Sequence, residues 1–256
     1  MIDPVAKAKW VLKMKGISDI PALSLGEIAK QEDIKYCYCD FPDDPLLDGI
    51  LLYKGSKRAI VVNTCIGNTG KHHFTFAHEL GHYFLEHPPS HYKDGQPGFR
   101  CTSDDIKKAH KPREAEANSF AVELLMPRDR FHLDMIGAPL DFGLINGLSN
   151  RYMVSKHACS NRILDLTHSP SIVIRTKSNQ ITGWSTSRAA KGYLRRMDVI
   201  PEDTYAHWAI IKKSGHDDFI DCDAGKWLVR AVPSLKVYEC THVHTESGHA
   251  MTILKW

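Results

Sequence analysis

The sequence predicts an α+β fold, in which residues 1–166 form helices around a small antiparallel sheet and residues 167–256 form a mostly β domain. Before Thr167, several stretches repeat apolar residues at the spacing of an amphipathic helix, and a β-hairpin signature lies among them. After Thr167, short apolar or alternating runs are separated by turn residues. The 256 residues suffice for one large domain or two modest ones.

The first elements of residues 1–166 are expected to be helical stretches followed by three strands. Residues 1–31 are predicted to be helical, and residues 24–31 form a second amphipathic stretch within them. A turn that contains Gly55 separates two apolar runs, which is the signature of a hairpin. The strands are expected at residues 34–39, 49–53 and 59–65.

Two strong helices are expected further along. The first covers residues 73–86 and ends before Pro88, and the second covers residues 113–126 and ends before Pro127. Residues 88–111 between them are rich in Pro, Gly, Ser, Asp and His and are predicted to form a long loop. Weaker helical patterns follow at residues 129–136, 143–152 and 155–166.

The remaining residues carry the pattern of short strands. Turn residues separate six runs that are either apolar or alternate between apolar and polar. The expected strands are residues 172–176, 181–186, 206–212, 226–231, 237–241 and 251–254.

The most informative motif is the pentapeptide His78-Glu79-Leu80-Gly81-His82. A helix advances about 100° per residue, so the two histidines lie about 40° apart and can bind one metal ion. Glu79 flanks the pair and can hold a metal-bound water without taking a coordination site. This is the H-E-x-x-H arrangement of zinc metalloproteases. Because glycine disfavours a helix interior by about 1 kcal/mol, another backbone element is expected to pack against Gly81.

A catalytic zinc ion needs a third protein ligand, and two carboxylates of the helix at residues 113–126 compete for this role. Glu114 shares the apolar face of this helix with Asn118, whereas Glu116 lies on the polar face with Ser119 and Glu123. A carboxylate on a buried face needs a positive partner, so Glu114 is the expected ligand. Asn118 is expected either to accept a hydrogen bond from a metal-bound histidine or to serve only in helix packing.

These residues predict a hydrolytic mechanism. Zinc lowers the pKa of a bound water toward about 7 and polarises a substrate carbonyl. Glu79 is the expected general base, which takes a proton from the water and delivers it to the leaving amine.

Two segments carry a resemblance to a known family. They read FTFAHELGH at residues 74–82 and ExxANxFAxxLLMP at residues 114–127. Together they resemble the ImmA/IrrE metallopeptidase family, over roughly residues 25–166. The resemblance implies a gluzincin-like catalytic domain with His78, His82 and Glu114 as zinc ligands and Glu79 as the base.

The resemblance also implies a substrate. Members of the family typically cleave a helix-turn-helix transcriptional repressor, which turns on a stress response or releases a mobile element. His73 departs from the family pattern, where arginine is frequent. Residues 167–256 have no counterpart in it, and an accessory or sensor role is expected for them by analogy alone.

Composition excludes several classes of protein. A net charge of +3 is too small to indicate a nucleic-acid-binding face, and no apolar run reaches the ~20 residues of a membrane span. The N-terminus lacks the apolar core of a signal peptide. Seven scattered cysteines without a C-x-x-C pair favour reduced thiols, and therefore the cytoplasm.

The preferred interpretation is a cytoplasmic zinc endopeptidase that cleaves one specific protein, with no membrane and no nucleic acid as direct partner. The alternative is a non-catalytic, metal-containing regulator that binds a repressor or DNA. Residues 143–167 have a weak helix-turn-helix character, but their basic residues are few. They are Arg151, Lys156 and Arg162.

Three further features remain open. An oxyanion-stabilising donor is sought among His87, His91, Tyr92 and Arg100, which follow the motif helix. A second metal site at His242, His244 and His249 is less favoured than exposed histidines on a sheet. The hairpin at residues 49–65 is a candidate edge for pairing with an extended peptide.

Overall fold

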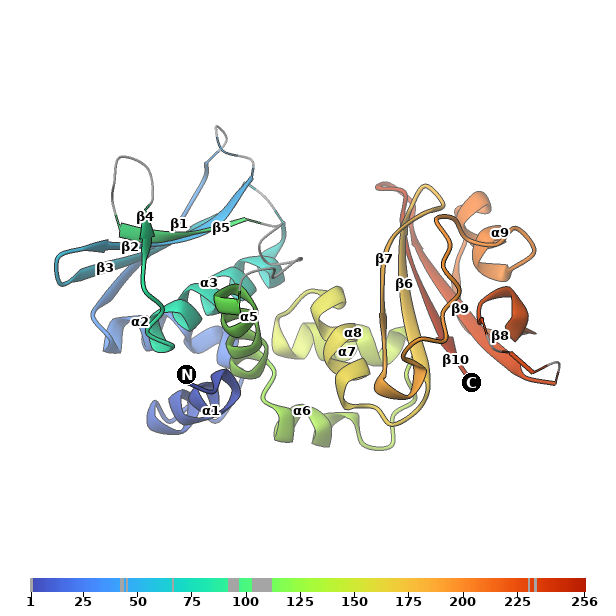
Figure 1. The fold of residues 1–256 in the computed structure, drawn as a ribbon, viewed down its shortest axis with the longest axis horizontal. Coiled ribbons are helices and arrows are strands. Elements are labelled where there is room, and N and C mark those ends of the chain that lie inside the picture. The colour runs from blue at the N-terminus through green and yellow to red at the C-terminus, as the bar shows by residue number, and fades with distance from the viewer. Residues whose placement is uncertain are drawn as a thin grey trace. The chain divides into compact units, whose positions relative to one another are not determined.

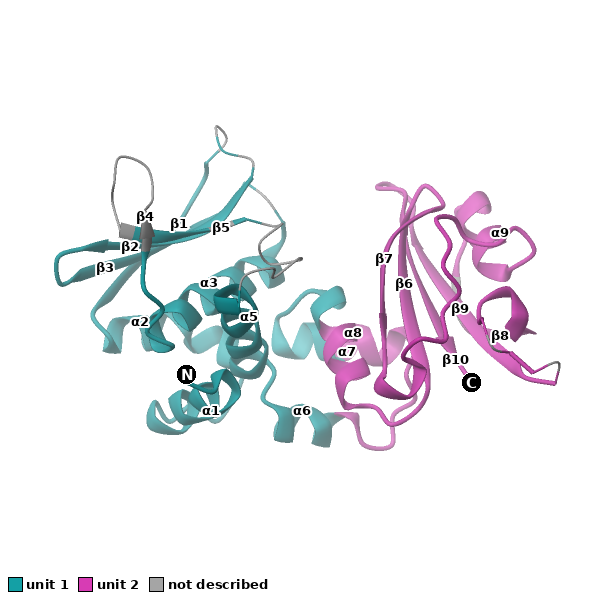
Figure 2. Ribbon diagram, viewed as in Figure 1, with its two compact units in different colours: residues 1–134, 148–158 teal, residues 135–147, 159–256 magenta. Residues whose placement is uncertain are grey.

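The structure of the chain is a computed structural model that describes residues 2–41, 44, 46–65, 67–91, 97–102, 112–229, 231–232 and 234–256. Two compact units divide the chain (Figure 2). Unit 1 comprises Met1–Asp134 and Leu148–Ala158, and unit 2 comprises Met135–Gly147 and Cys159–Trp256. The mixed helix and sheet content is that of the expected α+β class, while a domain boundary at residues 166 and 167 stays a prediction.

Unit 1 contains a five-stranded sheet with the order β1-β3-β2-β5-β4 (Figure 1). The expected hairpin is confirmed, since β2 and β3 pair in antiparallel fashion. The sheet is not wholly antiparallel, because β1 pairs with β3 in parallel and places Ile34 opposite Arg58. The chain reverses direction between β1 and β2 and again between β2 and β3, so β3 runs parallel to β1. Because β3 lies between β1 and β2 in the sheet, it pairs with β1. The strands are β1 (Ile34–Cys39), β2 (Leu47–Lys54), β3 (Lys57–Asn63), β4 (Ser90–His91) and β5 (Pro97–Thr102).

The prediction of one long loop over residues 88–111 is wrong for residues 97–102, which form β5 along the outer side of β2. The backbone contact is close, because a Cβ at Gly98 would lie 2.8 Å from the Leu51 carbonyl oxygen. Both hairpin strands therefore have neighbours on each side. The expectation that the hairpin supplies a free edge is wrong, and the outermost strands among the described residues are β1 and β4.

The helices of residues 1–166 follow the expected pattern, except that residues 15–20 interrupt the helical stretch expected over residues 1–31. Two begin at side-chain caps: Asp3 accepts a hydrogen bond from the Val5 amide at 2.9 Å, and Asn68 accepts one from the Lys71 amide at 3.0 Å. The Asn68 cap starts α3 four residues before the expected His73. The helices are α1 (Pro4–Met14), the 3-10 helix η1 (Pro21–Ser24), α2 (Leu25–Gln31), α3 (Thr69–Phe84), α5 (Pro112–Leu125), α6 (Arg128–Met135), α7 (Phe142–Tyr152) and α8 (Lys156–Leu166).

Polar contacts fix both ends of α3 within unit 1. Near its start, Lys71 pairs with the buried carboxylate of Asp48 at 2.6 Å, and His73 Nδ1 lies 2.8 Å from the Met153 carbonyl oxygen. At its end, Glu86 adopts a left-handed backbone with φ of 55°, and the His87 amide donates to the His82 carbonyl at 3.1 Å. The chain thus turns back beneath the last turn of α3.

Unit 2 is built on an antiparallel sheet with the order β7-β6-β10-β9-β8 (Figure 1). Four of the six expected strands are confirmed, within β6, β7, β9 and β10. The strand β8 was not anticipated, because its acidic sequence HDDFIDCD lacks a regular apolar alternation. The bounds are β6 (Ser171–Lys177), β7 (Gln180–Thr186), β8 (His216–Asp223), β9 (Lys236–His244) and β10 (His249–Lys255).

Two expected strands of unit 2 are wrong. Residues 206–212 lie in the helix α9 (Tyr205–Lys212), whose buried Ala206, Ala209 and Ile210 follow helical spacing. Of residues 226–231, Lys226 ends the short 3-10 helix η4 (Ala224–Lys226), Trp227 and Val229 lie in turns, and Leu228 makes only an isolated bridge to Leu194. Arg230 lies outside the described residues. Both segments pack on the core of unit 2, where Trp227 is fully buried, so their apolar runs reflect burial rather than strand formation.

Candidate metal centre

The site is built where α3 and α5 approach each other at Gly81. A Cβ added there would lie 3.1 Å from both the Cα and the carbonyl oxygen of Ala117. The expectation that a backbone element packs against Gly81 is therefore confirmed. Because the contact is backbone to backbone, side chains one turn to either side of it can converge. His78 and His82 lie on one helix, and Glu114 lies on the other.

Replacing Gly81 with valine is expected to lower the free energy of unfolding by about 1–3 kcal/mol, because the helices cannot keep their separation around the added atoms. Thermal unfolding and zinc titration measure the two effects, since moving α5 also moves Glu114. The matched control is Gly147→Val in α7, where a Cβ meets nothing within 4 Å. Equal losses of stability and of zinc binding in the two variants would contradict the role of the close contact at Gly81.

Three side-chain atoms meet at this crossing. His78 Nε2 lies 3.2 Å from Glu114 Oε2, His82 Nε2 lies 3.4 Å from the same oxygen, and the two Nε2 atoms are 3.0 Å apart. His78 and His82 are buried, and Glu114 is 9% exposed. Among the residues that the structure describes, this is the only group of at least three such ligands whose atoms all lie within 4.8 Å.

The spacing of these atoms fits a divalent cation. Bonds of about 2.0–2.1 Å in a tetrahedron place neighbouring ligand atoms about 3.3–3.4 Å apart. The hydrogen bond of His78 agrees with this, because its Nδ1 lies 2.9 Å from Asn118 Oδ1. When Nδ1 donates to that oxygen, the lone pair of Nε2 faces the carboxylate oxygen of Glu114, and a cation between the two removes the repulsion.

The surroundings of His82 and Glu114 favour the protonation states that bind a metal, which are a neutral imidazole and an ionised carboxylate. Burial lowers the pKa of His82 to about 4, so its imidazole is neutral at pH 7, as a ligand must be. Without a metal, burial alone would raise the pKa of Glu114, but hydrogen bonds that His78 and His82 donate outweigh it and lower the pKa below its usual value. A cation between these atoms would replace the donated protons and keep the carboxylate ionised. Glu114 is therefore ionised.

Glu79 lies beside the three atoms in a different environment. It is fully buried, and neither carboxylate oxygen has a partner at normal hydrogen-bond geometry among the described residues. Burial raises its pKa well above the usual value, Glu114 raises the pKa further, and the nearby backbone of Leu51 lowers it. The strand β2 passes close by, since a Cβ at Gly49 would lie 3.7 Å from Glu79 Oε1. A buried carboxylate without a partner is a candidate for proton transfer.

The structure adds contacts around His82 that the sequence did not suggest. Its ring stacks on Phe99 of β5 at 4.2 Å between centroids and 16° between planes. Its Nδ1 lies 2.9 Å from His87 Nδ1, and His87 Nε2 lies 3.0 Å from Glu116 Oε2. The sequence offers His87 only as a candidate oxyanion donor, and because it lies beyond the helix predicted over residues 73–86, no helical spacing places it.

Other candidates have different surroundings. Arg100 pairs with Asp44 at 2.8 Å, and Tyr92 and the side chain of His91 lie outside the described residues. Glu123, expected on a polar face, is buried and accepts a hydrogen bond from the Arg128 amide at 3.0 Å. The carboxylate of Glu123 therefore accepts from the first residue of α6.

Within the described part of the chain, the late histidines form no second group of three metal ligands, and two of the basic residues considered for DNA are engaged in ion pairs. Arg151 pairs with Asp134 at 3.1 Å, and Arg162 is buried and pairs with Asp165 at 3.3 Å. Of the late histidines, His244 Nδ1 lies 3.0 Å from Ser247 Oγ. No helix of the described chain is both long and apolar enough to cross a membrane.

Two histidines one turn apart and a carboxylate from a second helix, beside a buried glutamate, form an arrangement that is typical of metal-dependent hydrolases. Residues 29–164 match the IrrE N-terminal-like domain, peptidase family M78. The match covers more than half of the chain, so the chain belongs to this family, and the predicted ImmA/IrrE membership is confirmed.

Comparison with solved structures bears on the fold. A Mycobacterium tuberculosis transcriptional regulator is similar to the chain with a TM-score of 0.60 and 15% sequence identity, over 100% of this chain and 76% of that chain. At this identity the likeness concerns the fold alone. The search of curated proteins gave no match.

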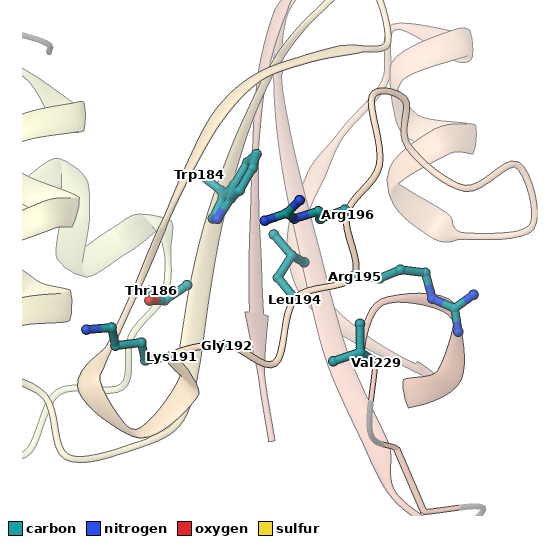
Figure 3. Close-up of a pocket in the computed structure, with 8 residues that line it drawn as sticks. All are labelled: Trp184, Thr186, Lys191, Gly192, Leu194, Arg195, Arg196 and Val229. Atoms are coloured by element: carbon teal, nitrogen blue, oxygen red, sulfur yellow. The ribbon is translucent and has the colours of Figure 1, made fainter.

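Unit 2 has a hollow of its own, with a volume of about 710 Å³ (Figure 3). Trp184 of β7 and Arg196 point into it from opposite sides. Its eight lining residues include three cationic side chains and no acidic one, so its charge favours anions. They are Trp184, Thr186, Lys191, Gly192, Leu194, Arg195, Arg196 and Val229.

Proposed function

We propose that the chain is a zinc-dependent endopeptidase with a gluzincin-like site, in which His78, His82 and Glu114 hold the metal and Glu79 is the general base. One observation carries the proposal. Three potential ligand atoms lie 3.0–3.4 Å apart beside a buried carboxylate that has no hydrogen-bond partner among the described residues. Two imidazoles and one carboxylate with an open position favour zinc.

The protein groups have distinct tasks in this mechanism. When bound, zinc lowers the pKa of a water molecule and polarises the carbonyl of the scissile bond. Glu79 takes the proton of the attacking water on its carboxylate and returns it to the nitrogen of the leaving amine. Its two unengaged oxygens suit this shuttle. Asn118 orients His78 through the 2.9 Å hydrogen bond, so that Nε2 rather than Nδ1 faces the site.

The alternative is a metal-containing regulator that binds a repressor or DNA without cutting. Structural zinc sites are usually closed by a fourth protein ligand. The group found among the described residues has three members. A closed site also has no need of a base such as Glu79. Both points favour the enzyme.

We further propose that the substrate is a helix-turn-helix transcriptional repressor and that cleavage takes place in the cytoplasm. Membership of the IrrE-like family supports this choice. The similar Mycobacterium tuberculosis protein is described as a transcriptional regulator, which agrees with a role in gene control.

Removing the metal is expected to stop cleavage, and restoring zinc is expected to recover it. The purified chain is incubated with a repressor encoded near its gene, in untreated, chelated and zinc-restored form, and the fragments are identified by mass spectrometry. Cleavage at one bond in the first and third samples supports the endopeptidase. Equal cleavage after verified metal removal, or no cleavage of any such repressor by the zinc-loaded chain, would overturn it.

A further inference from the structure

We propose that His87 and Glu116 form a positioning pair that fixes the proton arrangement and orientation of His82 for metal binding. The inference rests on the proposed metal site but adds two residues to it. It starts from the contacts between His82 Nδ1 and His87 Nδ1 at 2.9 Å and between His87 Nε2 and Glu116 Oε2 at 3.0 Å.

Only one arrangement of protons satisfies both contacts when Glu116 is ionised. A carboxylate accepts hydrogen bonds and does not donate them, so His87 Nε2 must carry the proton. In a neutral imidazole the other nitrogen is then an acceptor, so His87 Nδ1 receives a proton from His82 Nδ1. The Nε2 lone pair of His82 is thereby left facing Glu114 and His78. Glu116 thus selects, through His87, the tautomer of His82 that can bind a metal.

The opposite arrangement is excluded by the same contacts. If His87 Nδ1 donated to His82, the proton of His82 would sit on Nε2, between the two other ligand atoms. The lone pair of His87 Nε2 would then face the carboxylate of Glu116 at 3.0 Å. The first consequence prevents His82 from binding a metal, and the second sets a lone pair against a carboxylate in a site where His82 and His87 are buried.

The fold holds the pair in place from both sides. The left-handed turn at Glu86 and the hydrogen bond from the His87 amide to the His82 carbonyl return the His87 ring beneath the His82 ring. Phe99 stacks on the His82 ring, and the centroids of His87 and Phe99 are 6.4 Å apart. Glu116 lies two residues after Glu114, so α5 supplies one ligand and the anchor of another.

The two histidines are therefore supported by different means. His78 is oriented directly by Asn118, whereas His82 is oriented through an intervening imidazole. Outer partners of this kind typically change metal affinity by about 10–100-fold. We expect the same range for the loss of His87 or Glu116.

The experiment measures the zinc dissociation constant by chelator competition, together with the visible absorption spectrum of the cobalt-loaded protein. His87→Phe keeps an aromatic ring beside Phe99 but removes both hydrogen bonds, and Glu116→Ala removes the anchor. Both are expected to weaken zinc binding by about 10–100-fold and to change the cobalt spectrum. Glu116→Gln and His87→Gln keep an acceptor oxygen. They are expected to weaken zinc binding less than Glu116→Ala and His87→Phe do. Ser119→Ala, exposed on the same helix, is the control.

The outcomes separate this inference from the proposed function. Wild-type protein that binds no zinc would refute the metal site itself. Wild-type protein that binds zinc, with an unchanged dissociation constant and cobalt spectrum in both His87→Phe and Glu116→Ala, would overturn the positioning pair. If His87→Phe does not fold, the partly exposed Glu116 still provides the comparison of alanine with glutamine. Equal losses of zinc affinity in Glu116→Ala and Glu116→Gln would also refute the positioning pair.

Discussion

Replacing Glu79 with glutamine is expected to slow peptide hydrolysis by about 10²- to 10⁴-fold, while zinc stays bound near one equivalent per chain. Glutamine has the shape of glutamate but cannot accept and return a proton. Glu79 lies outside the group of three potential ligands, so its amide variant leaves their geometry intact. Because burial raises the pKa of Glu79 well above its usual value, removing the charge should not lower the thermal stability of the metal-free protein.

Metal content by mass spectrometry and initial cleavage rates are measured on the same preparation. Glu27→Gln, on α2 and remote in sequence from the motif, controls for the substitution itself. A Glu79→Gln variant with wild-type rates would remove Glu79 from the mechanism. A variant that lost its zinc would instead make Glu79 a determinant of metal binding.

Replacing Glu114 with glutamine is expected to weaken zinc binding by more than about 100-fold, which exceeds the range typical of an outer partner. The amide that replaces the carboxylate carries no charge and is a poor ligand. The buried imidazoles of His78 and His82 would then face the cation without its anionic partner. Chelator competition measures the change.

Glu116→Gln is the matched control, with the same substitution two residues away on the same helix. It should weaken binding by less than about tenfold, because its amide oxygen can still accept from His87. A larger loss in Glu116→Gln than in Glu114→Gln would reverse the assignment of the third ligand. The two variants together therefore test the argument that the third ligand is the carboxylate on the buried face of α5 and not the one on its polar face.

Local periodicity is enough to predict the helices of residues 1–166 that carry the candidate site, and the side chains that share a face on them. The spacing of His78 and His82 depends only on the helix, and the glycine between them signalled a close neighbour that the structure identifies as Ala117. The convergence of His78, His82 and Glu114 was an expectation from burial, and the structure brings their atoms together without testing metal binding. The hairpin was readable because its turn residues lie between two apolar runs.

Features that depend on partners distant in sequence were missed. The strand β5 pairs with β2 along its length, while its own sequence begins with Pro97 and Gly98 and contains no apolar run, so that it resembles a loop. Residues 206–212 were assigned to a strand for their apolar run, although the cap at Thr204 and the spacing of their buried residues indicate a helix. The contact of Glu116 with His87 joins residues on two elements, so no local pattern reveals it.

The backward bend after α3 constrains the number of residues between His82 and His87. A residue other than glycine in the left-handed region is disfavoured by about 1–2 kcal/mol, yet Glu86 occupies it with φ of 55°. The bend depends on the number of residues between His82 and His87 and on a left-handed backbone at position 86, not on a glutamate side chain. Glycine should therefore be accepted at position 86. An insertion or deletion between His82 and His87 would change the point at which the chain bends and move the His87 ring away from His82 Nδ1. A chain that altered this interval would have to recruit some other side chain to brace its second metal-facing histidine.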